Sequence, residues 1–248
     1  MTGPTYPEPR DLLRGKRVLV TAAAGTGIGF ATAKRCVEEG ATVFISDIHE
    51  GRLAKAADTL GVDAVRCDVT NEEDVQRMFA AAGEVDVLVN NAGLGGFSRL
   101  VDMEDEQWHR VLDVTLTGVM RCTRAALRHM VPRGQGAIVN NASVLGWRAQ
   151  EGQAHYAAAK AGVMALTRCA AVEGADAGVR VNAVAPSLAM HPFLSKVTPP
   201  GLLETLAAQE AFGRAAEPWE VANVIVFLAS DLSSYLTGEV LSVSSQRA

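Results

Sequence analysis

The sequence predicts a doubly wound α/β domain, in which helices cover both faces of a parallel sheet. Three observations lead to this fold class. Apolar, strand-like runs alternate with helical segments seven times, the composition does not break along the chain, and 248 residues suffice for one large core. Hydrophobic residues make up 48% of the chain and aromatic residues only 5%, which favours close-packed helices on strands and argues against disorder.

Each predicted strand is a short apolar run followed by a helical segment. The strands are expected at 16–22, 41–47, 63–69, 85–93, 136–143, 179–187 and 239–244. The helices are expected at about 27–39, 51–60, from 70 onwards, 105–130, 153–176 and 218–230. Thr70 or Asn71 can cap the third helix, and Glu73 lies in its first turn.

A single domain is expected at 13–248, after a flexible tail at 1–12 that is polar and rich in proline. The tail does not have the pattern of a signal peptide, and no apolar run reaches the length of a membrane span. The longest stretch without a clear element is 186–218, with one short helix at about 202–209. Because it follows the carboxyl end of a strand, residues 187–217 are predicted to form a substrate lid; the alternative is a plain surface insertion.

The charge balance favours a small molecule as partner. Lys plus Arg number 23 and Asp plus Glu 28, for a net charge of −5 without any basic block, which argues against nucleic acid or an anionic membrane. The cysteines show no metal-ligand spacing, so no metal site is expected, and they are interpreted as buried thiols of a cytoplasmic protein. They are Cys36, Cys67, Cys122 and Cys169.

The first strand runs into the glycine-rich turn "TAAAGTGIG" at 21–29, which is typical of a loop that holds a dinucleotide pyrophosphate at a helix N-terminus. Its glycines are spaced two apart, and alanines stand at 22–24, where the usual fingerprint has its first glycine. Ala23 takes that place with one extra residue, and Gly25 is expected to restore the conformational freedom of the turn. The predicted cofactor contacts here are Thr21, Ala23, Gly25, Thr26, Gly27 and Ile28.

Asp47 ends the second strand, 20 residues after Gly27, the offset at which a carboxylate meets the adenosine ribose. It would repel a 2′-phosphate, and its neighbours offer no clear arginine clamp, although Arg52 is close; NAD is therefore expected rather than NADP. The alternative is a helix cap or an ordinary polar strand end. Small and polar residues after the next two strands extend the rim for adenosine and its ribose: Asp68, Val69, Asn91, Ala92 and Gly93.

The strongest chemical signal is Ser143 at a strand end, followed by Tyr156 and Lys160, which lie four apart on one helical face. A phenol titrates near ~10, too high for a base at neutral pH, but an ammonium one turn away stabilises the phenolate. Lys160 would also hold the nicotinamide ribose, and Ser143 would bond the substrate oxygen as it passes between alcohol and carbonyl. The alternative to a catalytic role is that Ser143 is an ordinary hydroxyl at a strand end and Tyr156 an ordinary half-buried tyrosine on a helix.

Together these motifs resemble the short-chain dehydrogenase/reductase family across residues 13–243. The resemblance includes "NNAG" at 90–93, "HYAAAKAG" at 155–162, "VRVNAVAP" at 179–186 and the segment 226–243. It implies a Rossmann-type seven-stranded sheet of order 3-2-1-4-5-6-7, NAD(P)-dependent interconversion of alcohol and ketone, and a homotetramer or else a dimer. It also implies Ser143, Tyr156 and Lys160 as catalytic residues, and further cofactor contacts at Pro186, Ala189 and His191.

The chain departs from the family at four places. Thr115 stands where the family usually has an asparagine that shapes the water relay behind the lysine, so that relay is not carried over. Ser187 replaces a glycine, and the terminal "VDGG" has become "VSSQ" at 243–246. His191 replaces the threonine that meets the nicotinamide carboxamide, and is either a ligand contact or a lid residue.

With these departures, the chain resembles one branch of the family, which acts in bacterial catabolism of the cholesterol C and D rings. Three segments carry the resemblance: "TAAAGTGIG" at 21–29, "NNASVLGWRAQ" at 140–150 and "AFGRAAEPWEV" at 211–221. The branch implies a hydrophobic substrate, a hydroxylated methylhexahydroindanone propionyl-CoA ester that is oxidised to the ketone. Arg148 or Arg99 could meet the acyl-CoA group, and an apolar wall for a bicyclic ring is expected from Leu145, Trp147, Met190, Phe193 and Leu194. The alternatives are a 3-oxoacyl-thioester reductase, a dehydrogenase of intact hydroxysteroids, and a cofactor-binding protein without turnover.

Overall fold

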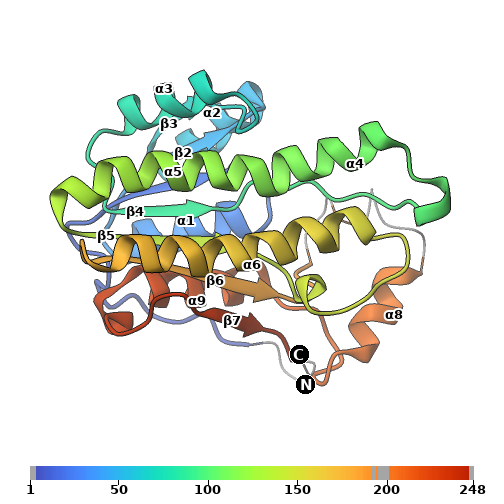
Figure 1. The fold of residues 1–248 in the computed structure, drawn as a ribbon. Coiled ribbons are helices and arrows are strands. Elements are labelled where there is room, and N and C mark those ends of the chain that lie inside the picture. Colours follow the sequence, from blue (N-terminus) through green and yellow to red (C-terminus); the bar gives the residue numbers. More distant parts are fainter. Residues whose placement is uncertain (1–3, 191–193, 195–200, 246–248) are drawn as a thin grey trace.

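The computed structural model describes residues 4–190, 194 and 201–245. Within them, a seven-stranded parallel sheet runs through the molecule with helices on both faces (Figure 1). Its order, β3-β2-β1-β4-β5-β6-β7, confirms the prediction. The strands are β1 (Arg17–Thr21), β2 (Thr42–Asp47), β3 (Asp63–Arg66), β4 (Val87–Asn90), β5 (Gly136–Asn141), β6 (Val179–Pro186) and β7 (Val240–Val243).

The helices agree closely with those expected from the sequence. In the described part of the chain they are α1 (Ile28–Glu38), α2 (Glu50–Leu60), α3 (Glu72–Ala82), α4 (Asp105–Leu112), α5 (Gly118–Met130), α6 (Ala154–Ala175), α8 (Leu202–Gln209) and α9 (Pro218–Ala229). The helix expected at 105–130 is α4 and α5 joined by a π-helical segment, Asp113–Thr117. Short 3₁₀ turns lie at Leu100–Asp102, Val131–Arg133, Val144–Gly146 and Asp231–Ser233.

Each face of the sheet has its own hydrophobic core, because successive strand residues point to opposite faces. In β1, Val18 and Val20 belong to a buried cluster with residues of α1 and α9, whereas Leu19 belongs to a cluster with residues of α3 and α5. Figure 1 shows α5 and α6 lying side by side in front of the sheet. Burial on both faces explains why the central strands β1, β2, β4, β5 and β6 are mainly apolar runs without alternation, whereas the edge strands β3 and β7 are more exposed.

The N-terminal segment contacts α1 and α9. The ring of Tyr6 packs edge-on against Trp219, with ring centroids 5.2 Å apart. The carboxylate of Glu39 is buried just after α1 and accepts hydrogen bonds from the backbone N–H groups of Arg10 (2.9 Å) and Leu12 (3.1 Å). The segment that the sequence predicts as a flexible tail thus supplies donors to a buried carboxylate.

The two ends of the region predicted to form a lid are hydrogen-bonded to each other. A parallel bridge pairs Ala189 with Ala216, and the N–H of Met190 donates to the carbonyl of Ala216 at 3.0 Å. The helix α8 coincides with the predicted short helix. Two predicted contacts, His191 and Phe193, lie outside the described residues, and the role of this region as a substrate lid stays a prediction.

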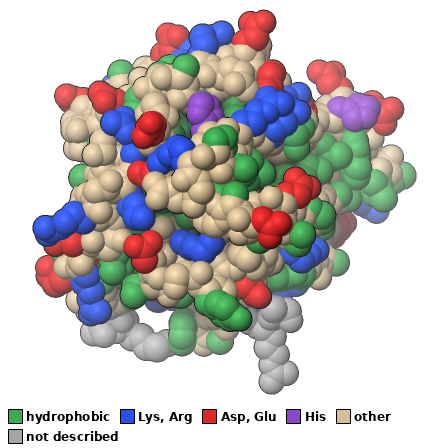
Figure 2. Space-filling model, turned by 60° about the vertical axis from the view of Figure 1, so that its left-hand side comes forward, with side chains coloured by type: hydrophobic (Ala, Val, Ile, Leu, Met, Phe, Trp, Pro, Cys, Tyr) green, Lys and Arg blue, Asp and Glu red, His purple; other side chains and the backbone are tan. Residues whose placement is uncertain are grey.

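The surface carries mixed charge. On the face drawn in Figure 2, basic and acidic side chains alternate over the surface instead of forming a large area of one sign. Among the described residues, no helix combines the length and apolar character needed to span a bilayer. The same part of the chain contains no cluster of three or more His, Cys, Asp or Glu side chains with the geometry of a metal site.

Candidate active site

The carboxyl ends of the parallel strands bring the predicted cofactor residues to one edge of the sheet. The described residues of this set are Thr21 at the end of β1, Ala23, Gly25, Thr26, Gly27 and Ile28 in the glycine turn and the start of α1, Asp47 at the end of β2, Asp68 and Val69 after β3, Asn91, Ala92 and Gly93 after β4, Pro186 at the end of β6, and Ala189 beyond it.

The glycine turn is bonded to the segment that follows β4. The Thr21 hydroxyl accepts from the N–H groups of Asn91 (3.0 Å) and Ala92 (3.2 Å). In return, the Asn91 amide donates to the carbonyls of Thr21 (3.2 Å) and Ala22 (3.0 Å). Side chain and backbone of these two segments therefore hold the turn in one conformation.

The left-handed residue of the turn is Ala22, with φ of 52°. The expectation that Gly25 gives the turn its freedom is therefore wrong, because φ of Gly25 does not lie in the left-handed region. A left-handed conformation costs a non-glycine residue about 1–2 kcal/mol. The hydrogen bond from Asn91 to the Ala22 carbonyl offsets part of that cost.

The start of α1 fits a dinucleotide pyrophosphate. A Cβ on Gly29 would lie 2.5 Å from the Ala22 carbonyl oxygen, so only glycine permits this approach of helix and turn. The N-cap residue Gly27 makes no side-chain cap bond, and the first turn of α1 contains no acidic residue. By contrast, Asn71 caps α3 and accepts from two backbone N–H groups. The open N–H groups and positive dipole end of α1 suit an anion.

Asp47 fits the ribose while also bracing the turn. Its carboxylate accepts from the N–H of Ala24 (3.2 Å) and the N–H of His49 (3.0 Å), and the Arg52 guanidinium lies 4.0 Å away. Burial raises the pKa of Asp47, while the hydrogen bond from Ala24 and the charge of Arg52 act in the opposite direction. Each carboxylate oxygen keeps a lone pair for a ribose hydroxyl, so the cap role and the ligand role are compatible.

The structure brings Ser143, Tyr156 and Lys160 together. Tyr156 and Lys160 lie on the first turns of α6, and Ser143 follows β5. The Lys160 ammonium lies 5.5 Å from the centroid of the Tyr156 ring and donates to the Asn141 carbonyl at 2.5 Å. The Ser143 hydroxyl accepts from the N–H of Leu145 at 3.2 Å. The three side chains thus have the arrangement that proton transfer at a substrate oxygen requires.

Burial disfavours charge on both titratable groups of this trio. It raises the pKa of Tyr156 to about 12, against a smaller lowering by the hydrogen bond with Ser143. It also lowers the pKa of Lys160 to about 8. At pH 7 the lysine is therefore still mostly protonated, while the phenol keeps its proton until additional positive charge arrives beside it.

Thr115 fixes the backbone beside the lysine. Fully buried in the π-helical segment, its hydroxyl accepts from the N–H of Leu94 (2.9 Å) and donates to the carbonyl of Leu94 (3.1 Å). A Cβ on the preceding Gly93 would lie 3.4 Å from the Lys160 ammonium. A hydroxyl has one donor and two acceptor positions, so Thr115 keeps a single lone pair beyond these bonds.

The loop after β4 is clamped to the start of α6, which the sequence did not reveal. The Gln153 amide donates to the carbonyl of Gly96 at 2.7 Å, and the N–H of Ser98 donates to the carbonyl of Gly152 at 3.0 Å. Gly152 is left-handed, with φ of 74°, and a Cβ there would run into the Phe97 ring. The glycines of "GLGGFS" at 93–98 were the available signal for a close backbone approach.

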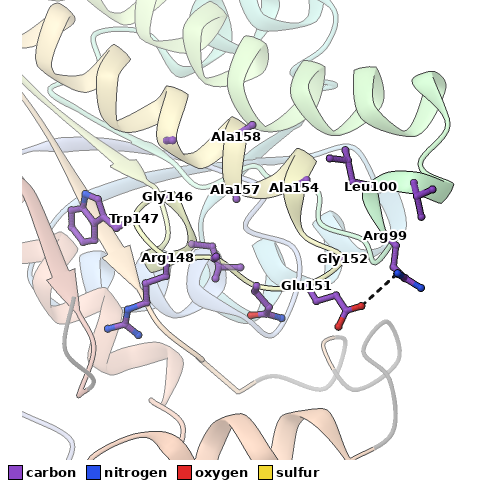
Figure 3. Close-up of a pocket in the computed structure, with 15 residues that line it drawn as sticks. Arg99, Leu100, Gly146, Trp147, Arg148, Glu151, Gly152, Ala154, Ala157 and Ala158 are labelled. Atoms are coloured by element: carbon purple, nitrogen blue, oxygen red, sulfur yellow. Dashed lines mark ion pairs between the residues drawn. The ribbon is translucent and has the colours of Figure 1, made fainter.

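Some predicted substrate residues line an open pocket of about 810 Å³ (Figure 3). Leu145, Trp147, Arg148 and Arg99 lie in its wall, and Arg99 pairs with Glu151 at 3.5 Å. The pocket follows the alanine-lined face of α6, formed by residues 154, 157, 158 and 161, and does not include the Tyr156 side chain. Of the predicted apolar wall, Leu145 and Trp147 therefore line this pocket, whereas Met190 and Leu194 do not.

The chain is similar to proteins of known type over nearly its whole length. The family model described as enoyl-(acyl carrier protein) reductase matches residues 22–245. The (5R,7aS)-5-hydroxy-7a-methyl-1-oxo-2,3,5,6,7,7a-hexahydro-1H-indene-carboxyl-CoA reductase of Mycobacterium tuberculosis is 63% identical over 247 residues, covering 95% of this chain and 94% of the relative. The cis-4-hydroxycyclohexanecarboxylate dehydrogenase of Sinomonas cyclohexanicum is 46% identical over 237 residues, covering 92% and 95%.

A solved structure agrees with these relatives. The crystal structure of a short chain dehydrogenase from Mycobacterium smegmatis matches with a TM-score of 0.87 and 58% identity, covering 99% of this chain and 98% of that one. The matched family model, the identity with relatives along nearly the entire chain and the shared fold support one conclusion. The chain belongs to the short-chain dehydrogenase/reductase family, whose members use nicotinamide cofactors, and is an oxidoreductase that acts between a hydroxyl and a ketone.

Proposed function

We propose that the protein is an NAD-dependent dehydrogenase that interconverts a secondary alcohol and a ketone on a steroid-derived ring. The proposed substrate is a CoA ester of the C/D-ring indanone propionate type, formed in sterol catabolism. The observation that carries the proposal is the meeting of Ser143, Tyr156 and Lys160 with the uncapped start of α1 at one edge of the sheet.

Each side chain has a separate task in this proposal. Ser143 holds the substrate oxygen, and Tyr156 accepts its proton during oxidation or returns it during reduction. Lys160 favours the phenolate form of Tyr156 through its charge and holds the nicotinamide ribose. The bound nicotinamide supplies the hydride acceptor or donor. Lys160 is buried and Tyr156 is half-buried, so the interaction between their charges is screened less than it would be in water.

The charges of the residues at and after the end of β2 favour binding of NAD over binding of NADP. Asp47 would repel a 2′-phosphate, while its carboxylate can accept hydrogen bonds from ribose hydroxyls. The neighbouring cation, Arg52, lies 4.0 Å from that carboxylate and is half exposed. Its charge is therefore already matched by Asp47.

The names of the relatives support the substrate class. One acts on a hydroxylated indene-carboxyl-CoA, and another on a cyclohexane ring with a hydroxyl and a carboxylate. Both substrates, as named, are ring alcohols; the first carries a carboxyl-CoA group and the second a free carboxylate. The apolar residues Leu145 and Trp147, close to Ser143 in the chain, fit a bicyclic ring.

We also propose that the protein is cytoplasmic and forms a homo-oligomer, a tetramer or else a dimer. The thiols support the location: burial raises the pKa of Cys36 and that of Cys67 to about 12, and free, inert thiols of this kind suit a reducing compartment. Light scattering on the purified protein measures the assembly; a monomer at micromolar concentration contradicts this part.

A substrate screen tests the proposal. Sterol-fragment CoA esters, their free acids, intact hydroxysteroids and simple acyl thioesters are each assayed with NAD and NADP cofactors, with Tyr156→Phe as the inactive control. We expect the fastest turnover with a ring-alcohol CoA ester and NAD. NADPH consumption with acyl thioesters would identify a 3-oxoacyl-thioester reductase, and turnover of a four-ring alcohol a hydroxysteroid dehydrogenase. Cofactor binding without any turnover would identify a binding protein.

A further inference from the structure

Two neighbouring asparagines at the end of β5 point to opposite faces of the sheet. Asn140 is fully buried, and its amide group accepts from Asn90 (2.8 Å) and donates to Thr167 (2.9 Å). Asn141 donates instead to the side-chain oxygen of Asn91 at 3.0 Å, within the predicted cofactor site. The two side chains therefore belong to different networks.

Asn141 connects the lysine with the glycine turn. Its carbonyl oxygen accepts from the Lys160 ammonium at 2.5 Å, and its side-chain amide donates to Asn91. Asn91 in turn donates to the carbonyl of Ala22, the left-handed residue of the turn. Hydrogen bonds to the backbone and side chain of Asn141, and from Asn91, thus connect Lys160 with the loop that would hold the pyrophosphate.

One atom in this series lacks a partner. The side-chain oxygen of Asn141 is buried and accepts no hydrogen bond from the described residues. A buried acceptor of this kind is normally satisfied by protein, water or ligand. The same side-chain amide contacts Asn91, and the Asn141 backbone carbonyl contacts Lys160. Because both neighbours are predicted cofactor contacts, a cofactor hydroxyl is the fitting donor.

We propose that Asn141 is a positioning residue that couples seating of the cofactor at the glycine turn to placement of Lys160, and that its side-chain oxygen accepts a hydrogen bond from a ribose hydroxyl of the bound cofactor. The inference rests on the proposed function and assigns a role to a residue outside the Ser143, Tyr156 and Lys160 trio.

Loss of the Asn141 amide then affects proton transfer through Lys160. The Lys160 ammonium contacts the ring of Tyr156 and the Asn141 carbonyl, and it lies close to Gly93; burial is the cause of its lowered pKa. Tyr156 is thus the titratable group that faces it. A less firmly placed ammonium stabilises the phenolate less, so the apparent pKa of Tyr156 in the loaded enzyme rises.

The test uses Asn141→Leu, which removes the amide and keeps approximate side-chain size, and Asn141→Asp, which keeps the shape but loses the donor to Asn91. NADH binding is measured by fluorescence titration, and kcat for alcohol oxidation is measured against pH. We expect about tenfold weaker NADH binding in both variants. For Asn141→Leu we also expect the pH midpoint of kcat to move upward by roughly half a unit.

The matched control is Asn140→Leu, which makes the same change one residue earlier on the opposite face. We expect it to lower the unfolding temperature, because Asn90 and Thr167 each lose one hydrogen-bond partner, and to leave NADH affinity and the pH midpoint unchanged. If it does not fold, Thr167→Val interrupts the same network. Folded Asn141 variants with NADH affinity within about twofold of wild type and an unmoved midpoint would overturn the inference.

The binding measurement separates this inference from the proposed function. Should the wild type bind NADH but turn over none of the screened alcohols, the proposed function fails, while the titrations still report on Asn141. Should the wild type turn over a ring alcohol while the Asn141 variants bind NADH normally and keep the midpoint, only the role of Asn141 fails.

Discussion

The two halves of the carboxyl edge of the sheet differ in how their polar groups are satisfied. On the cofactor side, around β1 and β2, the carboxylate of Asp47 and the amide of Asn91 bond to backbone groups of the glycine turn and its neighbours. On the reacting side, around β5 and α6, the Lys160 ammonium donates to the Asn141 carbonyl, and desolvation moves the pKa of Tyr156 and that of Lys160 against the charged form of each. The turn on the cofactor side is held by hydrogen bonds within the protein, whereas the phenolate on the reacting side needs the positive charge that a cofactor brings.

The largest expected effect comes from breaking the reacting side alone. Tyr156→Phe removes the proton carrier and keeps the ring, so kcat should fall about 10³-fold. NADH binding should stay near that of the wild type, because the glycine turn is untouched. Steady-state kinetics and a fluorescence titration measure the two quantities. Undiminished turnover would remove Tyr156 from the mechanism.

A substitution in the glycine turn region should instead weaken NADH binding. A Cβ on Gly29 would lie 2.5 Å from the Ala22 carbonyl oxygen, and backbone cannot yield as a flexible side chain can. Overpacking of this kind costs about 1–3 kcal/mol, so Gly29→Ala should weaken NADH binding roughly thirtyfold. The control is Gly51→Ala in α2, where a Cβ meets nothing within 4 Å. Equal affinities of the two variants would contradict the role of this close approach.

Substitution of Asp47 tests whether the cofactor side of the sheet edge selects NAD over NADP. Asp47→Ala removes the charge that repels a 2′-phosphate, so the ratio of kcat/KM for NAD over NADP should fall about tenfold. Asp58→Ala deletes the same charge from an exposed position on α2 and serves as the control. A ratio that stays constant in both variants would argue against contact between Asp47 and the ribose.

The smallest effect is expected at the N-terminal segment, which braces the cofactor side from outside. The Tyr6 ring contacts Trp219, and its hydroxyl donates to Glu38 at 2.6 Å. Tyr6→Ala should lower the free energy of unfolding by about 1 kcal/mol without changing kcat. Chemical denaturation measures the loss. The control is Tyr235→Ala, at a fully exposed position, and an equal loss there would show that the ring contact of Tyr6 contributes nothing.

The fold was predictable because its determinants are local. Buried strands appear as apolar runs, and the cap of α3 was visible in the sequence as Asn71 with acidic residues after it. The trio was predictable for a similar reason: a spacing of four on one helix places Tyr156 and Lys160 together. These patterns depend on residues that are close in the chain.

The missed features depend on contacts between distant segments. Ala22 is left-handed, and its carbonyl accepts a hydrogen bond from Asn91 in the segment after β4; glycine spacing alone could not show this contact. The partners of Asn141 and Thr115 likewise come from other elements. The N-terminal segment resembles a free tail in composition, and its attachment becomes visible only once Trp219 is folded beside it. The composition of a segment cannot predict a contact such as that of Tyr6 with Trp219, which lie more than 200 residues apart in the chain.

The ionisation of Tyr156 reports whether the cofactor supplies the positive charge that its phenolate needs. Tyrosinate absorbance is titrated in wild type and Tyr156→Phe, each with and without NAD, and the difference between the proteins isolates this residue from Tyr6 and Tyr235. The account predicts a pKa of Tyr156 near 12 in the free protein and a clearly lower pKa with NAD, because the cofactor adds positive charge beside the phenol. The same pKa in both states would contradict it.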